Sequence, residues 1–200
     1  MGNYKEETIN SYNKHAKKFS EKFQELMTLN KRYEFKRFVD LLPGKKILDL
    51  GCGAGDHAYY FSKQGLQLTC VDLSTEMIKL CKEKGLNAHI MDIEDLKFEA
   101  NNFDGIWAVT SLLHIPKLGL PSLINKLWKI LKKNGILYVC VKEGEGERLI
   151  EDKGFNSKRF FSFWKKEEII DLFKKNFSLI EFREAKLGHT NFLMFFFRKT

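Results

Sequence analysis

The stretch Ile47–Gly55, which reads ILDLGCGAG, decides the fold of this chain of 200 residues. An apolar run typical of a buried strand ends at Leu50, and glycines follow at positions 51, 53 and 55. Glycine permits a tight turn and lets a ligand approach the backbone without a Cβ in the way. A helical pattern begins at Asp56, and the free N–H groups at a helix N-terminus attract polar or anionic groups. Strand, turn and helix together predict a site for a nucleotide-like ligand.

Apolar runs and helical patterns alternate along the rest of the chain. Strands are expected at Lys46–Leu50, Leu68–Leu73, Ala88–Ile93, Phe103–Ser111, Ile136–Val141, Ser178–Glu184 and Phe192–Arg198. Helices are expected at Asp56–Lys63, Thr75–Lys84, Leu120–Lys133 and Lys165–Asn176, with Ser74 as an N-cap and Asn134-Gly135 as a stop. This alternation predicts an α/β fold, a doubly wound and mostly parallel seven-stranded sheet with helices on both faces and an antiparallel C-terminal hairpin. Ligands of such sheets bind outside the carboxyl ends of the strands.

The composition indicates an ordered, basic protein. Eighteen Phe and only three Pro favour a packed core over disorder. The net charge of +8 comes from lysines spread over several helical stretches, such as Lys129, Lys132 and Lys133 in one and Lys174 and Lys175 in another. A solvated surface is the simpler interpretation, although positive potential also attracts polyanions and leaves a nucleic-acid partner open.

The cysteines and the hydropathy indicate the cellular compartment of the protein. Cys52, Cys70, Cys81 and Cys140 lie far apart in apolar segments, without a C-x-x-C pair and without a secretory leader ahead of them, which is typical of reduced thiols in a cytoplasmic protein. No apolar run approaches the roughly 20 residues that cross a bilayer, so no membrane partner is expected. The five histidines show no metal-ligand spacing, and no metal site is expected.

Three carboxylates narrow the ligand class. Asp56 stands where the dinucleotide fingerprint needs its third glycine, and its negative charge disfavours a pyrophosphate there. Asp72 ends the second strand about 20 residues after Gly51, where an acidic side chain can accept hydrogen bonds from both ribose hydroxyls. Asp92 closes the third strand and could take an adenine amino group. The alternatives are a turn-capping role for Asp72 and a surface position for Asp92.

Five segments, taken in order, resemble the motifs of class I S-adenosylmethionine-dependent methyltransferases. These segments are Ile47–Gly55, Val71-Asp72-Leu73-Ser74 with Met77, Met91-Asp92-Ile93, Phe103–Trp107 and Ile130–Leu137. The resemblance covers nearly the whole chain, and five motifs in register are far more specific than one. It implies a Rossmann-like methyltransferase of the small-molecule type with S-adenosylmethionine as its cofactor.

The resemblance also implies roles for individual residues. Those assigned to cofactor binding are Tyr12, Asp49, Gly51, Cys52, Gly53, Asp72, Leu73, Met77, Asp92, Ile93 and Ser111. Asp49 and the glycine turn would line the methionine half, and Leu73 and Met77 would pack against adenine. Tyr12 would reach the cofactor from an N-terminal lid, with a helix-core aromatic as the alternative.

The acceptor side is expected at the same edge of the sheet. His114 follows the fourth strand and is a candidate base, or a histidine packed under the loop. Glu143 and Glu147 could face an amine acceptor, or form a solvated acidic turn. Arg159 and Phe160 belong to the segment RFFSFW, which resembles a stretch of bacterial small-molecule methyltransferases.

A chain of this length can bury one substantial core, so a single domain, residues 1–200, is expected. Residues 1–42 contain no proline and would form a lid of two amphipathic helices. Residues 45–142 would form the cofactor-binding core, residues 143–164 a substrate-side segment, and residues 165–200 the C-terminal helix and hairpin.

We therefore predict methyl transfer to the oxygen or nitrogen of a small-molecule acceptor. Two alternatives stay open. The basic charge allows an RNA methyltransferase, although the Asn/Asp-Pro-Pro-aromatic motif of base N-methylation is replaced by Thr110-Ser111-Leu112-Leu113. A cofactor-binding partner protein without turnover would keep the same cofactor motifs. The sequence does not fix the acceptor or the oligomeric state.

Overall fold

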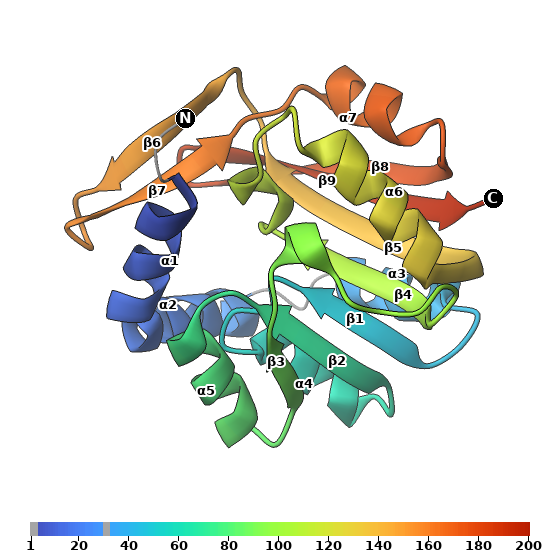
Figure 1. The fold of residues 1–200 in the computed structure, drawn as a ribbon, viewed down its shortest axis with the longest axis horizontal. Coiled ribbons are helices and arrows are strands. Elements are labelled where there is room, and N and C mark those ends of the chain that lie inside the picture. Colours follow the sequence, from blue (N-terminus) through green and yellow to red (C-terminus); the bar gives the residue numbers. More distant parts are fainter. Residues whose placement is uncertain (1–3, 30–32) are drawn as a thin grey trace.

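The computed structural model describes residues 4–29 and 33–200 (Figure 1). A seven-stranded sheet forms its centre, with the strand order β3-β2-β1-β4-β5-β9-β8. The strands are β1 (Lys46–Leu50), β2 (Gln67–Asp72), β3 (Asn87–Ile90), β4 (Phe103–Val109), β5 (Leu131–Lys142), β8 (Phe177–Leu187) and β9 (Thr190–Lys199). The first five run parallel, whereas β9 pairs antiparallel with both β5 and β8. The expected fold class is confirmed.

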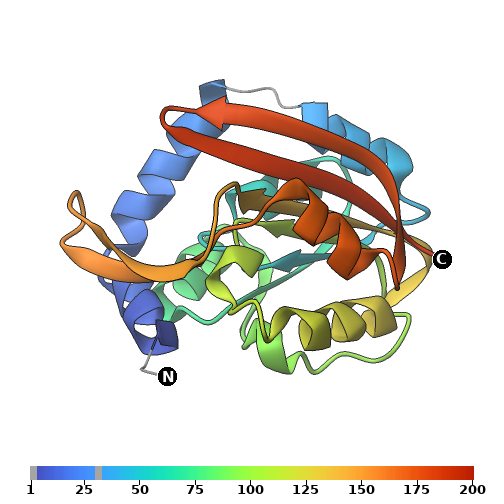
Figure 2. The ribbon, with the colours of Figure 1, turned by 90° about the horizontal axis from the view of Figure 1, so that it is seen from above.

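Helices cover both faces of the sheet, as Figures 1 and 2 show. On one face lie α3 (Tyr33–Leu41), α4 (Asp56–Lys63) and α5 (Thr75–Glu83), whose apolar side chains pack with Ile47 of β1. On the other lie α6 (Leu120–Ile130) and α7 (Lys166–Phe173), which pack with Leu48 and Leu50. Successive side chains of β1 point to opposite faces of the sheet, so this strand contributes to the hydrophobic core on each face.

One helix boundary follows the predicted capping chemistry, and a second has a cap that the sequence analysis did not name. The Ser74 hydroxyl accepts a hydrogen bond from Met77 N at 3.2 Å and caps α5, as expected. At α7 the Glu168 carboxylate accepts from Lys165 N at 2.7 Å. This helix is shorter at both ends than the stretch Lys165–Asn176 predicted from the sequence.

The prediction of two N-terminal helices is wrong, because the structure has three. They are α1 (Tyr4–Lys14), α2 (Ala16–Leu29) and α3. A turn at His15 separates the first two. The helices pack on different partners: α3 inserts Phe35 and Phe38 into the core of the sheet, whereas α1 lies against α5 and the strand at Ser157–Ser162. A continuous apolar pattern cannot show such a change of partner.

The predicted end of the helix before β5 is also wrong. The helix stops at Ile130 rather than at Lys133, because Leu131 is fully buried and pairs with Phe103 as the first residue of β5. Lys132 then reaches Asp104 at 2.8 Å. The expected Asn134-Gly135 stop lies within the strand, where Asn134 has a φ of +63°.

The sequence did not predict a two-stranded ribbon formed by β6 (Glu147–Asp152) and β7 (Ser157–Ser162). The two strands pair antiparallel around a turn at residues 153–156. Both views show the ribbon beside α1. It occupies most of the segment expected on the substrate side. In the described parts of the chain, no helix is long and apolar enough to cross a membrane.

Candidate functional site

The glycine loop after β1 has the backbone that the sequence predicted. Gly51, Gly53 and Gly55 have φ values of +72°, +54° and +79°, a region that favours glycine. A Cβ on Gly51 would lie 2.4 Å from the Ser111 Cβ, and one on Gly55 would lie 2.5 Å from the Cys81 Sγ. Around Gly53 nothing lies within 4 Å of such an atom. The loop therefore packs tightly at Gly51 and Gly55 and faces free space at Gly53.

That free space belongs to a cavity at the carboxyl ends of β1, β2, β3 and β4. It holds about 820 Å³, its mouth included. The residues that line it are Lys5, Thr8, Ile9, Tyr12, Gly51, Gly53, Asp72, Leu73, Ser74, Met77, Asp92, Ile93, Val109, Thr110, Ser111, His114 and Ile115. The structure thus brings together every predicted cofactor residue except Asp49 and Cys52.

Asp72 combines the two roles that the sequence left open. Its Oδ1 accepts a hydrogen bond from Ser74 N, and its Oδ2 accepts one from Gly53 N, both at 2.9 Å. It therefore caps the turn and fastens the glycine loop, while it also lines the cavity. Burial raises the pKa of Asp72, an effect that these backbone donors oppose. Each oxygen keeps a further lone pair for a ligand hydroxyl.

Asp92 lies at the far end of the cavity and already has a cationic partner. Its Oδ1 accepts from Glu94 N at 2.9 Å, and its Oδ2 lies 2.7 Å from the Lys5 ammonium. Burial alone would lower the pKa of Lys5, but the bonds to Asp92 and Glu94 raise it overall. A ligand amino group at Asp92 would share the carboxylate with Lys5.

Asp49 lies beneath the loop, outside the cavity lining. It is 3% exposed, and its Oδ2 has no hydrogen-bond partner among the described residues. Burial raises its pKa well above the usual value, and the Ala58 N–H opposes this. Cys52 likewise points away from the lining, with its Sγ 3.4 Å from Gly53 O.

Helix α1 carries four lining residues that form one stripe. Lys5, Thr8, Ile9 and Tyr12 follow the helical spacing i, i+3, i+4 and i+7. Only Tyr12 was predicted from the sequence. Extending the same helical face from Tyr12 toward the N-terminus would have found the other three.

A hydrogen-bonded network joins Tyr12 to the ribbon. Its hydroxyl lies 2.8 Å from His114 Nε2 and accepts from Arg159 Nη1 at 3.1 Å, while Arg159 Nη2 lies 2.9 Å from Asp152. His114 Nδ1 lies 2.6 Å from Phe160 O. A carbonyl oxygen can only accept, so Nδ1 carries the proton and Nε2 accepts from the Tyr12 hydroxyl.

This environment changes the role expected for His114. Burial lowers the pKa of His114 to about 3, and the nearby Arg159 and Lys142 act in the same direction. A neutral imidazole of such low basicity accepts a proton poorly. The geometry favours a positioning role, in which His114 holds the Tyr12 hydroxyl at the cavity.

The structure places the other predicted acceptor-side residues outside the cavity lining. Arg159 reaches the cavity only through Tyr12. Phe160 contributes its backbone, with its N–H donating to Thr8 Oγ1 at 2.9 Å.

Glu143 lines a separate cavity behind the ribbon and accepts from Asn191 Nδ2 at 2.9 Å. Glu147 accepts from the Ser162 hydroxyl at 3.0 Å. Neither glutamate faces the cavity, so the amine-binding role expected of them has no support there.

Comparison with known proteins agrees with the sequence motifs. Residues 47–135 match the family profile described as "Methyltransferase domain". Phosphoethanolamine N-methyltransferase 2 of Caenorhabditis elegans is 29% identical over 149 residues, which are 70% of this chain and 34% of that protein. A ubiquinone biosynthesis O-methyltransferase of Xanthomonas oryzae is 30% identical over 105 residues, which are 49% of this chain and 43% of that protein. The chain thus spans less than half the length of these relatives.

A solved structure shows the same fold over most of the chain. The 1,6-didemethyltoxoflavin-N1-methyltransferase of Burkholderia thailandensis, crystallised with S-adenosylhomocysteine, is 20% identical, with a TM-score of 0.67. The match covers 92% of this chain and 87% of that one. The ordered motifs, the strand order and the profile match lead to one conclusion: residues 47–135 form a domain of the class I S-adenosylmethionine-dependent methyltransferase type.

Proposed function

We propose that this chain transfers a methyl group from S-adenosylmethionine to a small-molecule acceptor in the cytoplasm. The observation that carries the proposal is the cavity at the carboxyl edge of the sheet, where the glycine loop, Asp72 and Asp92 lie together beneath α1. All four cysteines are free thiols, which suits a reducing compartment.

The lining suits each part of that cofactor. Asp72 offers oxygen acceptors to ribose hydroxyls, and Leu73, Met77 and Ile93 offer apolar surface to a flat purine ring. The Ser111 hydroxyl is buried without a hydrogen-bond partner among the described residues and can serve a polar group beside Gly51. When bound, the cofactor supplies a methyl group on a positively charged sulfonium.

The chain's own part in the transfer is to align the reactants and to exclude water. Helix α1 covers the cavity and is fastened to the ribbon through Thr8–Phe160 and through Ser11–Ser157, whose hydroxyls are 2.8 Å apart. The Tyr12–His114 bond fixes a hydroxyl at the edge where the acceptor would arrive. Holding an acceptor at attack distance in a dry site can supply much of a rate enhancement.

The charges beside this edge favour an acceptor with an anionic group. Lys142 ends β5 and lines the same separate cavity as Glu143, while its ammonium lies 4.2 Å from the centroid of the Phe161 ring, which packs on His114. Arg159 lies 5.2 Å from the same centroid but is paired with Asp152. Among the described residues no carboxylate forms an ion pair with Lys142. Burial and the Arg159 charge lower the pKa of Lys142 to about 8, so an anion placed there would stabilise its charged form. The phosphoethanolamine methyltransferases among the relatives are named for a phosphate-bearing acceptor.

The first test concerns the cofactor class. We expect S-adenosylhomocysteine to bind more tightly than NADH in isothermal titration calorimetry, because Asp56 stands in place of the third dinucleotide glycine while Asp72 and Asp92 provide nucleoside acceptors. Tighter binding of NADH would refute the proposed cofactor.

The second test concerns the acceptor. We expect a panel of amines and phenols, each offered with and without a phosphate or carboxylate, to release S-adenosylhomocysteine mainly from its anionic members. Lys142→Met should raise KM for these acceptors about tenfold or more, the loss expected for a hydrogen bond to a charged group. KM should also rise as the pH rises through about 8, because Lys142 then loses its proton. Besides burial, the charges of Arg159 and Lys22 lower the pKa of Lys142, and that of Asp152 raises it.

Lys166→Met is the matched control, because Lys166 also lies over a phenylalanine ring, 4.3 Å from the Phe182 centroid, but on α7. It should leave KM unchanged. An unaltered KM in Lys142→Met would remove the anionic acceptor from the proposal. Turnover of RNA but of no small molecule would favour the nucleic-acid alternative, and binding without any turnover would favour a partner protein.

A further inference from the structure

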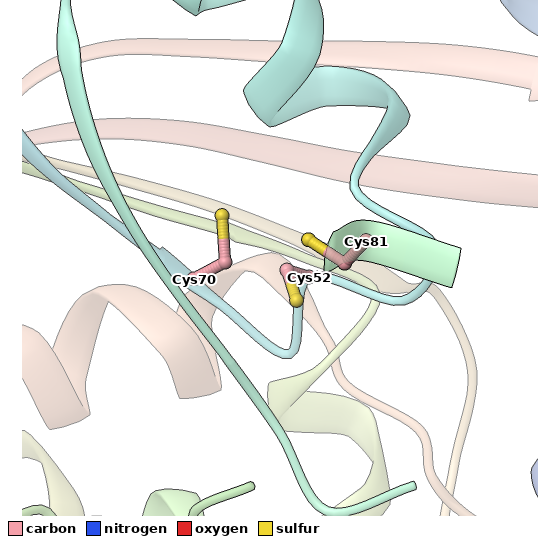
Figure 3. A group of neighbouring side chains, drawn as sticks. All are labelled: Cys52, Cys70 and Cys81. Carbon is pink, nitrogen blue, oxygen red and sulfur yellow. The ribbon is translucent and has the colours of Figure 1, made fainter. Parts of the chain in front are cut away.

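Three cysteines from separate parts of the chain meet beneath the glycine loop. Cys52 belongs to the loop, Cys70 to β2 and Cys81 to α5, and their side chains lie together in Figure 3. Their Sγ atoms all lie within 4.8 Å of one another. Cys70 and Cys81 are fully buried, whereas Cys52 is half-buried. Cys140 lies outside this group.

We propose that Cys52, Cys70 and Cys81 form a three-thiolate site for a soft divalent metal ion of the zinc class. Thiolate ligands select soft or borderline ions such as Zn²⁺ over Mg²⁺ or Ca²⁺. A catalytic-type zinc site commonly has three protein ligands and leaves its fourth position to water or another small ligand. The three sulfur atoms are buried, and Cys52 is the only one of these residues that is partly exposed.

The distances are close to those that an ion requires. The centre of three atoms 4.8 Å apart lies about 2.8 Å from each, and a Zn–S bond is about 2.3 Å long. Each sulfur would therefore move by at most about half an ångström. Cys52 can supply much of this movement, because it lies between two glycines in a turn whose next member, Gly53, has free space around it.

The surrounding charges suit a divalent ion better than a monovalent one. The thiols lose three protons on binding, so that three thiolates and one divalent ion carry a net charge of −1. A monovalent ion would leave a net charge of −2 in this buried position beside Asp49, whose Oδ2 has no hydrogen-bond partner among the described residues. Lys84 interacts electrostatically with Cys81, and its ammonium also pairs with Asp56 at 2.7 Å.

The site would be coupled to the glycine loop. A Cβ on Gly55 would lie 2.5 Å from the Cys81 Sγ, so the backbone of the loop already packs closely against this sulfur. An ion held by Cys52 would tie the loop to β2 and α5 as well. The proposal concerns metal binding alone and does not depend on the methyl-transfer function.

Metal titration of the 200-residue chain tests the site. The protein, reduced with a phosphine and freed of metal, is titrated with Cd²⁺, whose thiolate charge-transfer absorption reports sulfur ligation, and Zn²⁺ is then added to displace it. We expect one Cd²⁺ per chain, displacement by Zn²⁺, and a rise in Tm with bound metal, since an ion that binds only the folded state stabilises it.

Cys52→Ser and Cys81→Ser should each lower the affinity for Cd²⁺ at least a hundredfold, while Cys140→Ser should bind like the parent protein. Cys52→Ser is the informative variant if a change at a fully buried position prevents folding, because Cys52 lies in the loop and is half-buried. Absence of a thiolate band at stoichiometric Cd²⁺, or an equal loss of binding in Cys140→Ser, would overturn the proposal.

Discussion

Asp72→Ala should weaken the binding of S-adenosylhomocysteine by about 1.5–3 kcal/mol, or roughly ten- to a hundredfold, the range for a hydrogen bond to a charged group. The proposed reason is that the carboxylate accepts from the ribose hydroxyls. The structure adds a second reason, because Asp72 also binds Gly53 N and holds the loop in place. Calorimetry measures the affinity, and thermal unfolding shows whether the fold survives.

Two further variants distinguish the loss of ribose binding from the loosening of the glycine loop. Asp72→Asn keeps an acceptor oxygen for one of the two backbone donors and should lose less affinity than the alanine variant. Asp95→Ala removes an exposed carboxylate that pairs with Lys97 at 2.8 Å on the surface, and it should change nothing. If a well-folded Asp72→Ala protein kept its full affinity, Asp72 would be a turn cap alone.

Deletion of residues 1–25 should abolish turnover and weaken cofactor binding, while the sheet stays folded. This deletion removes α1 and most of α2, and with them the stripe from Lys5 to Tyr12 that covers the cavity. It also removes Asn13, whose Oδ1 accepts from the Ser74 hydroxyl at 2.7 Å beside Asp72. The sheet begins only at Lys46, and α3 remains to cover its face.

Turnover is followed by release of S-adenosylhomocysteine and binding by calorimetry, with far-ultraviolet circular dichroism to check the fold. Tyr12→Phe is the milder companion, because it removes only the hydroxyl that bonds to His114 and Arg159. It should lower kcat more than it lowers cofactor affinity. Full turnover in the truncated chain would show that the N-terminal helices are packing elements and that the acceptor lies elsewhere.

The sequence alone determined the fold class and most of the residues that line the cavity beside the glycine loop. The turn after the buried strand has positive φ values at Gly51, Gly53 and Gly55, which glycine adopts without strain, so the local sequence identifies the loop. Asp72 and Asp92 could be placed beside it because the carboxyl ends of neighbouring parallel strands meet at one edge of the sheet. Strand periodicity supplied the rest of the sheet.

Helix ends depended on partners that a local pattern does not contain. Leu131 joins β5 because it can be buried opposite Phe103, although the helical pattern continues past it. The break at His15 separates α1, which packs on the ribbon and on α5, from α2, which packs on α4 and α5. In both places tertiary packing overrides local propensity.

Only the tertiary structure decided which side chains meet across long stretches of chain. Tyr12, His114 and Arg159 form one network although more than a hundred residues separate the first from the others, and burial then makes His114 a weak base. Glu143 turns toward Asn191, and with Lys142 it lines a cavity separate from the one at the glycine loop. Contacts and pKa values of this kind depend on burial and on neighbours from other elements, and neither is set by the residues next to them in the sequence.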